Sequence, residues 1–178
     1  MDDILLQRIR NQDKTAFEIL YNQYANYAMR VATAVTGSSA IAADAVQETF
    51  IRIYYHIDKY KSDQPFEPWL YRILINECNR ILKNGSKVSY ISDYIETVSK
   101  EDSYHFEEYE ELYHAIETLD SKLKIPIVLM YLKGFKESEI AQILNININT
   151  LKSRLYKGRQ KLKRLMVNSE DRRRSNNA

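Results

Sequence analysis

The stretch SEIAQILNININTLKSRLYKGRQKL, residues 138–162, determines the fold of the C-terminal half of this chain. Its first part, residues 138–144, predicts a short helix with apolar residues on one side. Asn145 follows, and asparagine tolerates the left-handed backbone that a tight turn requires. Asn149 or Thr150 can then cap a second helix. Two helices joined by such a turn form a helix-turn-helix.

The second helix of this stretch separates its apolar residues from its polar ones. On a helical wheel, one narrow face carries Leu151, Leu155, Gly158, Leu162 and Met166. The opposite side carries Lys152, Ser153, Tyr156, Lys157, Gln160 and Lys163. The apolar face can pack on the preceding short helix, which leaves the polar side free. A helix fits the major groove of DNA, where its N-terminal residues reach base edges.

Charge alone leaves two other interpretations of this basic helix open. It could be a solvated helix packed on its own domain, or it could lie on an anionic membrane surface. The preceding short helix and the capped turn favour a helix-turn-helix that reads DNA.

The composition of the whole chain favours an all-helical protein. Its 178 residues suffice for one medium domain or two small ones. Hydrophobic residues make up 44% and charged residues 28%, and there are only four Gly and three Pro. Good helix formers run through long stretches. We therefore predict an all-α fold of two small helical domains.

Helical periodicity and its interruptions predict the domain boundaries. We expect a helical bundle over residues 1–85, a linker over 86–104, a helix-turn-helix domain over 105–168 and a disordered tail over 169–178. The helices expected in the first domain span about 14–35, 41–60 and 68–84. Those expected in the second span about 106–119, 123–133, 137–144 and 150–167.

Charge is distributed unevenly, although the net charge is only +2. Residues 93–117 contain nine acids and one Lys, whereas residues 152–164 contain seven bases and no acid. An acidic linker region and a basic C-terminal helix predict separate partners for separate segments.

A stretch of the first domain, residues 53–80, mixes aromatic with basic residues. Its members include Tyr54, Tyr55, His56, Lys59, Tyr60, Lys61, Phe66, Trp69, Tyr71, Arg72 and Arg80. Aromatic faces stack on unpaired bases, at ~1–3 kcal/mol for each base, while basic residues track the backbone. Several of these aromatics could equally be core residues, so binding of single-stranded DNA and simple packing stay open.

Several classes of function find no support in the residues. The histidines have no Cys or carboxylate partners at metal-ligand spacing, so we expect no metal. No phosphate-binding loop, nucleophile elbow or catalytic carboxylate pair occurs, so we expect no cofactor and no enzyme. The single Cys78 fits a reducing compartment. Neither a signal peptide nor a membrane-spanning run is visible, which predicts a cytoplasmic protein.

Three motifs together resemble one family. DAVQETF at 44–50, PWLYRILIN at 68–76 and the stretch at 138–162 are similar, in order and spacing, to segments of extracytoplasmic-function (ECF) sigma factors of the sigma-70 family. The resemblance covers the chain from about Ala16 to Leu165. It implies a subunit that binds core RNA polymerase and directs promoter recognition and transcription initiation.

The resemblance implies two sets of site residues in the first domain, which is similar to region 2 of the family. The helix with DAVQETF resembles the one that docks on the polymerase, with Asp44, Gln47 and Glu48 as exposed contacts. The following loop and helix resemble the segments that capture and read the −10 element. The implied contacts there are Lys59, Tyr60, Lys61, Phe66, Trp69, Arg72, Asn76 and Arg80.

The second domain is similar to region 4, which reads the −35 element. The implied DNA contacts are Asn147, Asn149, Lys152, Ser153, Arg154, Tyr156 and Lys157. The family commonly has Gly at position 145, and often Pro and Gly at positions 147 and 149, where this chain has Asn. These differences affect the expected −35 preference.

The resemblance also bears on further partners. The linker resembles the segment that threads the RNA exit path of the polymerase, where its acids could mimic RNA; an ordinary solvated linker explains them equally well. Family members are commonly held by an anti-sigma factor, so such a partner is possible here. The helix-turn-helix alone fits a second function, a stand-alone transcriptional regulator that binds DNA as a dimer. The chain has no sustained heptad pattern for such a dimer.

Overall fold

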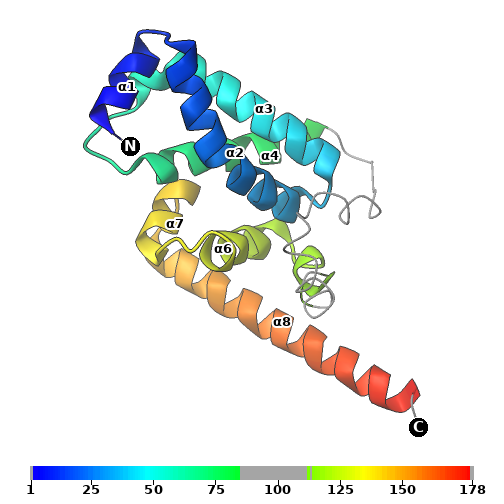
Figure 1. The fold of residues 1–178 in the computed structure, drawn as a ribbon. Coiled ribbons are helices and arrows are strands. Elements are labelled where there is room, and N and C mark those ends of the chain that lie inside the picture. The colour runs from blue at the N-terminus through cyan, green and yellow to red at the C-terminus, as the bar shows by residue number, and fades with distance from the viewer. Residues whose placement is uncertain (1, 85–111, 113, 177–178) are drawn as a thin grey trace.

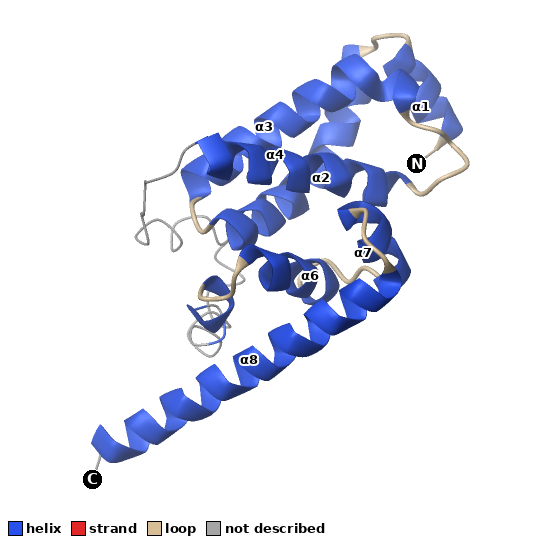
Figure 2. Ribbon diagram, turned by 180° about the vertical axis from the view of Figure 1, so that it is seen from behind, coloured by secondary structure: helices blue, strands red, loops and turns tan. Residues whose placement is uncertain are grey.

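The computed structural model describes residues 2–84, 112 and 114–176, and within these residues every regular element is a helix (Figures 1 and 2). The elements in chain order are α1 (Asp3–Arg10), α2 (Lys14–Thr36), α3 (Ser39–His56), the short 3-10 helix η1 (Ile57–Lys59), α4 (Phe66–Asn84), α6 (Ser121–Tyr131), α7 (Glu137–Leu144) and α8 (Ile148–Asn176). The predicted all-α fold is confirmed. The expected linker, residues 86–104, lies outside the described residues.

Side-chain caps and one glycine define the N-terminal helices. The side chain of Asp13 accepts a hydrogen bond from the backbone N–H of Ala16 at 3.1 Å, which begins α2. That bond lowers the pKa of the Asp13 carboxyl. Gly37 ends α2 with a left-handed backbone, at a φ of 70°, which costs glycine little. Ser38 caps α3 through the backbone N–H of Ile41.

The N-terminal half is a bundle in which α2, α3 and α4 bury one face each. Its fully buried side chains include Leu20, Val31, Ala42, Ala45, Ile53, Leu70 and Leu74. Cys78 is buried among them, and burial raises the pKa of its thiol to about 12. The short helix α1 packs on α2 and η1. Figure 1 shows α1 at one end of this bundle.

The C-terminal half packs α7 and α8 against α6. Leu151 and Leu155 of α8 are completely buried, as is Ile140 of α7. Gly158 lies where α8 crosses α6, with Ile127 of α6 next to it. The apolar face predicted for the second helix of the motif is therefore the face that forms this core.

The two halves are in contact, and their buried residues form one continuous apolar core. Helix α7 lies on α4, and α6 lies near α2 (Figures 1 and 2). The ring of Tyr71 on α4 meets the ring of Phe135 edge-on, with centroids 5.1 Å apart. Between the halves, the Lys133 ammonium lies 3.0 Å from the Glu67 carboxylate, and its side chain is only 14% exposed.

The ends of two elements differ from the sequence expectation. The sequence predicts disorder after Asn168, but the backbone of α8 stays helical as far as Asn176. The sequence after Asn168 contains no Gly or Pro that would end a helix, which explains the correction. The expected helix 41–60 is also interrupted, because α3 ends at His56 and η1 follows.

Replacing Gly158 tests the close approach of α6 and α8. A Cβ at this position would lie 3.1 Å from Cγ1 and 3.3 Å from Cδ1 of Ile127. For Gly158→Ala, the gain in helix propensity of about 1 kcal/mol offsets this crowding, so stability changes little. Gly158→Leu lowers the free energy of unfolding by about 1–3 kcal/mol through overpacking. Thermal and urea denaturation measure both variants, and equal stability of the two would contradict the close crossing.

Candidate nucleic-acid interface

Helices α7 and α8 meet at a tight turn of the helix-turn-helix type. Asn145 takes the predicted left-handed conformation, with φ 49° and ψ 51°. The backbone N–H of Ile146 donates to the carbonyl of Ala141 at 3.0 Å, which closes the end of α7. The cap of α8 differs from expectation, because the side-chain oxygen of Asn147 accepts from the N–H of Asn149 at 2.8 Å. Asn147 thus caps the helix in place of Asn149 or Thr150.

The exposed face of α8 begins directly after this cap. Asn147, Asn149, Lys152, Ser153, Tyr156 and Lys157 are all exposed. Arg154 is half-buried and lies at the edge of this face. Lys152 has one distant partner, the carboxylate of Glu137 at 4.0 Å, and such an exposed pair is worth little energy. The first three turns of α8 therefore present donors and one aromatic ring to the outside.

In the N-terminal half, α4 carries an exposed row formed by Arg72, Asn76 and Arg80. These residues recur every four positions, so they share one side of the helix. Arg72 is engaged in this structure, because its guanidinium donates to the carbonyl of Gln142 on α7 at 2.7 Å. Asn76 is exposed, and Trp69 at the start of the helix is half-buried.

Two aromatic residues of the expected −10 set lie in the core instead of on the surface. Tyr60 is 4% exposed and Phe66 is 2% exposed. Their rings pack edge-on at 5.2 Å, and Tyr60 also lies 5.3 Å from the ring of Trp69. The Tyr60 hydroxyl donates to the carbonyl of Gln64 at 2.5 Å. Neither ring is accessible for stacking on a base. The expectation that Tyr60 and Phe66 contact bases directly is therefore corrected: in this structure both side chains support the loop.

The rest of this loop is exposed and braced from α1. Lys59 and Lys61 point basic groups to the surface on either side of buried Tyr60. Arg10 of α1 donates to the carbonyl of Tyr60 at 2.9 Å and lies 4.0 Å from the carboxylate of Asp58. The loop backbone is thereby held against the bundle, a role for Arg10 that sequence periodicity did not reveal.

The expected docking residues lie along α3 beside a groove. Asp44 and Gln47 are exposed, and Glu48 is half-buried. The groove between α2 and α3 has a volume of about 700 Å³, and Gln47 is part of its wall. Other residues that line it are Phe17, Tyr21, Met29, Ile51 and Tyr55. An apolar groove with a polar rim suits a helical protein partner.

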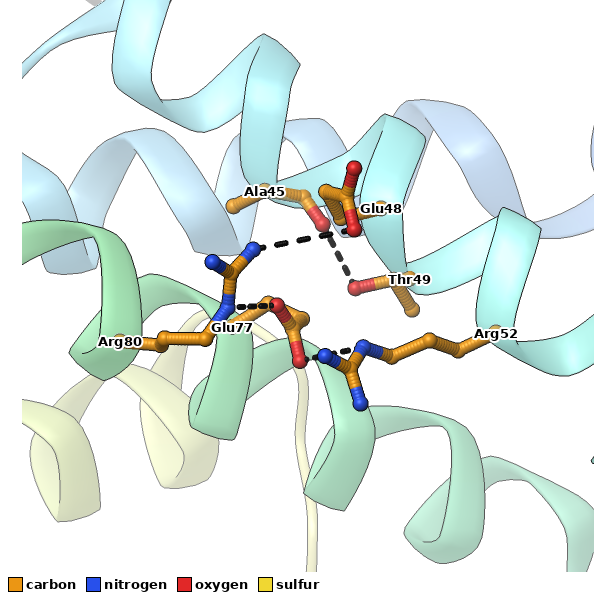
Figure 3. Close-up of polar contacts among 6 residues, drawn as sticks. All are labelled: Ala45, Glu48, Thr49, Arg52, Glu77 and Arg80. Atoms are coloured by element: carbon orange, nitrogen blue, oxygen red, sulfur yellow. Dashed lines mark hydrogen bonds and ion pairs between the residues drawn. The ribbon is translucent and has the colours of Figure 1, made fainter.

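Helices α3 and α4 are joined by a set of ion pairs (Figure 3). Glu77 of α4 is buried, and its carboxylate lies 2.7 Å from Nε of Arg52 and 2.6 Å from Nε of Arg80. Arg80 also lies 3.7 Å from the carboxylate of Glu48. One expected docking residue and one expected −10 residue are therefore neighbours. Sequence patterns give no signal for the pairing of Glu77 with Arg52, because this contact joins positions 25 residues apart.

The described residues offer no sign of a metal centre or a membrane span. No group of three or more His, Cys, Asp or Glu side chains among them is arranged to hold a metal ion. None of the described helices combines the length and the apolar character that crossing a bilayer requires.

The fold and the site together define a helical DNA-binding protein of two domains, one of which carries a helix-turn-helix. Comparison with known proteins then gives the family. The models for sigma-70 region 2 and sigma-70 region 4 match residues 20–87 and 109–162. The ECF RNA polymerase sigma-E factor of Escherichia coli (strain K12) is 30% identical over 174 residues, which cover 89% of this chain and 91% of that protein. The corresponding factor of Haemophilus influenzae is 28% identical over 89% of this chain and 92% of its own length.

Solved structures also share the fold, and two of them are compared with this chain. One is CnrH in complex with the cytosolic domain of CnrY, with a TM-score of 0.71, 22% identity, and coverage of 92% of this chain and 96% of that one. The other is the sigma factor RpoE of Bartonella quintana with the anti-sigma factor NepR, with a TM-score of 0.64, 20% identity, and coverage of 85% and 96%. The chain belongs to the ECF family of RNA polymerase sigma factors. It is a transcription initiation factor, and the match to region 2 sets the stand-alone regulator aside.

Proposed function

We propose that the two halves of this sigma factor divide promoter recognition between them. The N-terminal half, residues 1–85, docks on core polymerase through Asp44, Gln47 and Glu48 and binds the −10 element through α4 and the preceding loop. The C-terminal half, residues 105–168, binds the −35 element through the start of α8. The main support is that Lys152, Ser153, Tyr156 and Lys157 are exposed while Leu151 and Leu155 of the same turns are buried. We expect the protein to act in the cytoplasm, where core polymerase meets promoters.

The residues proposed to contact the −10 element are the members of the expected set that are exposed or half-buried. They are Lys59, Lys61, Trp69, Arg72, Asn76 and Arg80. Basic groups bind phosphates, which position the protein, while Asn76 can bond a base edge. Trp69 is half-buried and offers the only partly accessible ring of its immediate cluster with Tyr60 and Phe66.

We also propose that an anti-sigma factor controls this chain. Of the two structures of similar fold, one contains CnrH with the cytosolic domain of CnrY, and the other contains the sigma factor RpoE with the anti-sigma factor NepR. In this chain the groove between α2 and α3 is an apolar surface to which such a protein could bind. A partner seated there would lie beside Gln47 and so compete with polymerase docking.

Polymerase docking predicts the effect of changes on α3. Asp44→Ala combined with Gln47→Ala removes two exposed polar contacts, so core affinity falls about tenfold while the fold is retained. Competition for core polymerase against unlabelled wild-type chain measures the affinity, and co-elution on a sizing column checks the complex. Asp63→Ala is the matched control, because it removes an exposed acid beyond the end of α3 and leaves core affinity unchanged. Equal core affinity for wild type and the double variant would exclude this docking face.

The −35 assignment predicts different effects for two lysines of α8. Lys152→Ala relaxes base preference, because a bidentate base contact is worth roughly 1–3 kcal/mol of discrimination. Lys163→Ala weakens binding to all sequences alike and reduces the salt dependence, as expected for a phosphate contact. Holoenzyme assembled with each variant and tested on a library of −35 sequences measures both effects. Identical profiles for the two variants would contradict the assignment of base and phosphate contacts.

The proposed function also predicts that the two halves separate in the holoenzyme. The two promoter elements are about 25 base pairs apart, which is roughly 85 Å of duplex. In this structure α4 and α7 touch, and Arg72 is bonded to Gln142. The contact between α4 and α7 must open before α4 and α8 can occupy their elements together.

A zero-length carbodiimide crosslinker tests this separation. It joins the Lys133 amine to the Glu67 carboxylate, which are 3.0 Å apart, and peptide mapping identifies the product. We expect the crosslink in the free chain and its loss in proportion to the holoenzyme formed. Glu67→Gln removes the reacting carboxylate, so it is the control that the mapped crosslink is the one between Lys133 and Glu67. An undiminished crosslink in assembled, promoter-bound holoenzyme would contradict the separation.

A further inference from the structure

Glu77 is a charged residue in an apolar setting. It lies on the side of α4 that faces α3, and it is only 3% exposed. Burying a carboxylate is costly unless it is paired and hydrogen-bonded. Both of its oxygens meet that condition, since one lies 2.7 Å from Nε of Arg52 and the other 2.6 Å from Nε of Arg80 (Figure 3). Such charge-assisted contacts are short and directional.

The contact with Glu77 restricts the guanidinium of Arg80. Its Nε points inward to Glu77, and its Nη2 is 3.7 Å from Glu48. The guanidinium is planar and its donors have a fixed fork geometry, so holding Nε sets the direction of the remaining N–H groups. The side chain is still 44% exposed, which leaves part of the fork accessible from outside.

Arg80 lies one turn after Asn76 on the same side of α4, and Asn76 is also exposed. An unrestrained arginine would lose much rotamer freedom on binding DNA. Here Glu77 has removed that freedom before DNA arrives. Pre-organisation of this kind raises affinity without adding a contact.

We propose that Glu77 is a positioning residue for −10 recognition, which holds the Arg80 guanidinium in the orientation that meets promoter DNA beside Asn76. The inference rests on the proposed function, because it requires Arg80 to contact the −10 element. Glu77 is buried and does not itself reach DNA. It acts through Arg80, while its contact with Arg52 satisfies the other carboxylate oxygen.

The two arginines allow positioning to be distinguished from simple stabilisation. Both hold the same carboxylate at nearly the same distance, but Arg52 lies on α3 and belongs to none of the proposed DNA contacts. If the ion pairs only tie α3 to α4, losing Arg52 and losing Glu77 have similar consequences. If Glu77 orients Arg80, only the loss of Glu77 affects promoter opening strongly.

The test is a double-mutant cycle with Glu77→Gln and Arg80→Ala, measured as open-complex formation by holoenzyme on a promoter with the wild-type −10 element. Core affinity and thermal denaturation are measured in parallel. We expect each single variant to lower open-complex formation about tenfold at unchanged core affinity. The double variant should be no worse than Arg80→Ala, because residues that act as one unit are not additive. Arg52→Gln should stay near wild type.

A second variant keeps the test decisive if Glu77→Gln does not fold. Arg80→Lys keeps the surface charge, but one ammonium group cannot hold Glu77 and also present a fixed fork outward. We expect Arg80→Lys to show most of the loss of open-complex formation that Arg80→Ala shows. Full open-complex formation by Arg80→Lys would overturn the proposal.

The remaining outcomes separate this inference from the proposed function. If Arg80→Ala opens promoters normally, Arg80 is no DNA contact, and both the −10 assignment of Arg80 and the inference are wrong. In another outcome Arg80→Ala is defective, and Glu77→Gln lowers open-complex formation by the same factor in the Arg80→Ala chain as in the wild-type chain. Glu77 then acts independently of Arg80. In that case, or if Arg52→Gln is as defective as Glu77→Gln, the inference alone is wrong.

Discussion

The structure depends on the position of α4, which packs on both halves of the molecule. Leu70, Leu74 and Cys78 face the bundle and are completely buried. Tyr71 lies on the adjacent side of the helix and meets Phe135 of the C-terminal half. The exposed row of Arg72, Asn76 and Arg80 occupies the side that remains. A single helix of 19 residues is thus constrained on most of its circumference, so its exposed row has little freedom to rotate.

Ion pairs at two places on α4 add direction to this apolar packing. Apolar burial is not directional, whereas a buried charge is stabilised only when an oppositely charged partner lies in the right place to pair with it. Glu77 sets α4 against α3, and Glu67 near its start meets Lys133 of the other half. Lys133 also lies over the rings of Tyr27 and Tyr71, at 5.1 and 5.6 Å from their centroids. The first set lies inside one half and survives separation of the halves, while the second exists only when they touch.

The sequence predicted the elements that local chemistry determines. The Gly37 break, the left-handed Asn145 and the two faces of α8 follow from backbone preference and helical period, and the structure has all three. The fate of Tyr60 and Phe66 could not be predicted, because an aromatic residue in a basic stretch gives the same signal whether it is buried or exposed. Glu77 and Lys133 were missed for another reason. Their partners lie far along the chain, and only the packed fold brings them together.

The packing of the halves leaves one proposed DNA surface accessible and engages part of the other. The exposed start of α8 is open in the free chain, whereas Arg72 of α4 is bonded to the backbone of α7. Separating the halves leaves the Gln142 carbonyl to water and the Arg72 guanidinium to water or DNA, and it also parts Lys133 from Glu67. Phosphate contacts from one short helix start give weak, salt-dependent binding. Under the proposed function, free energy from docking α3 on polymerase would offset the cost of separating the halves, so that both surfaces could act on one promoter. On this proposal, a requirement for core polymerase would follow from the same contacts that hold the two halves together in the free chain.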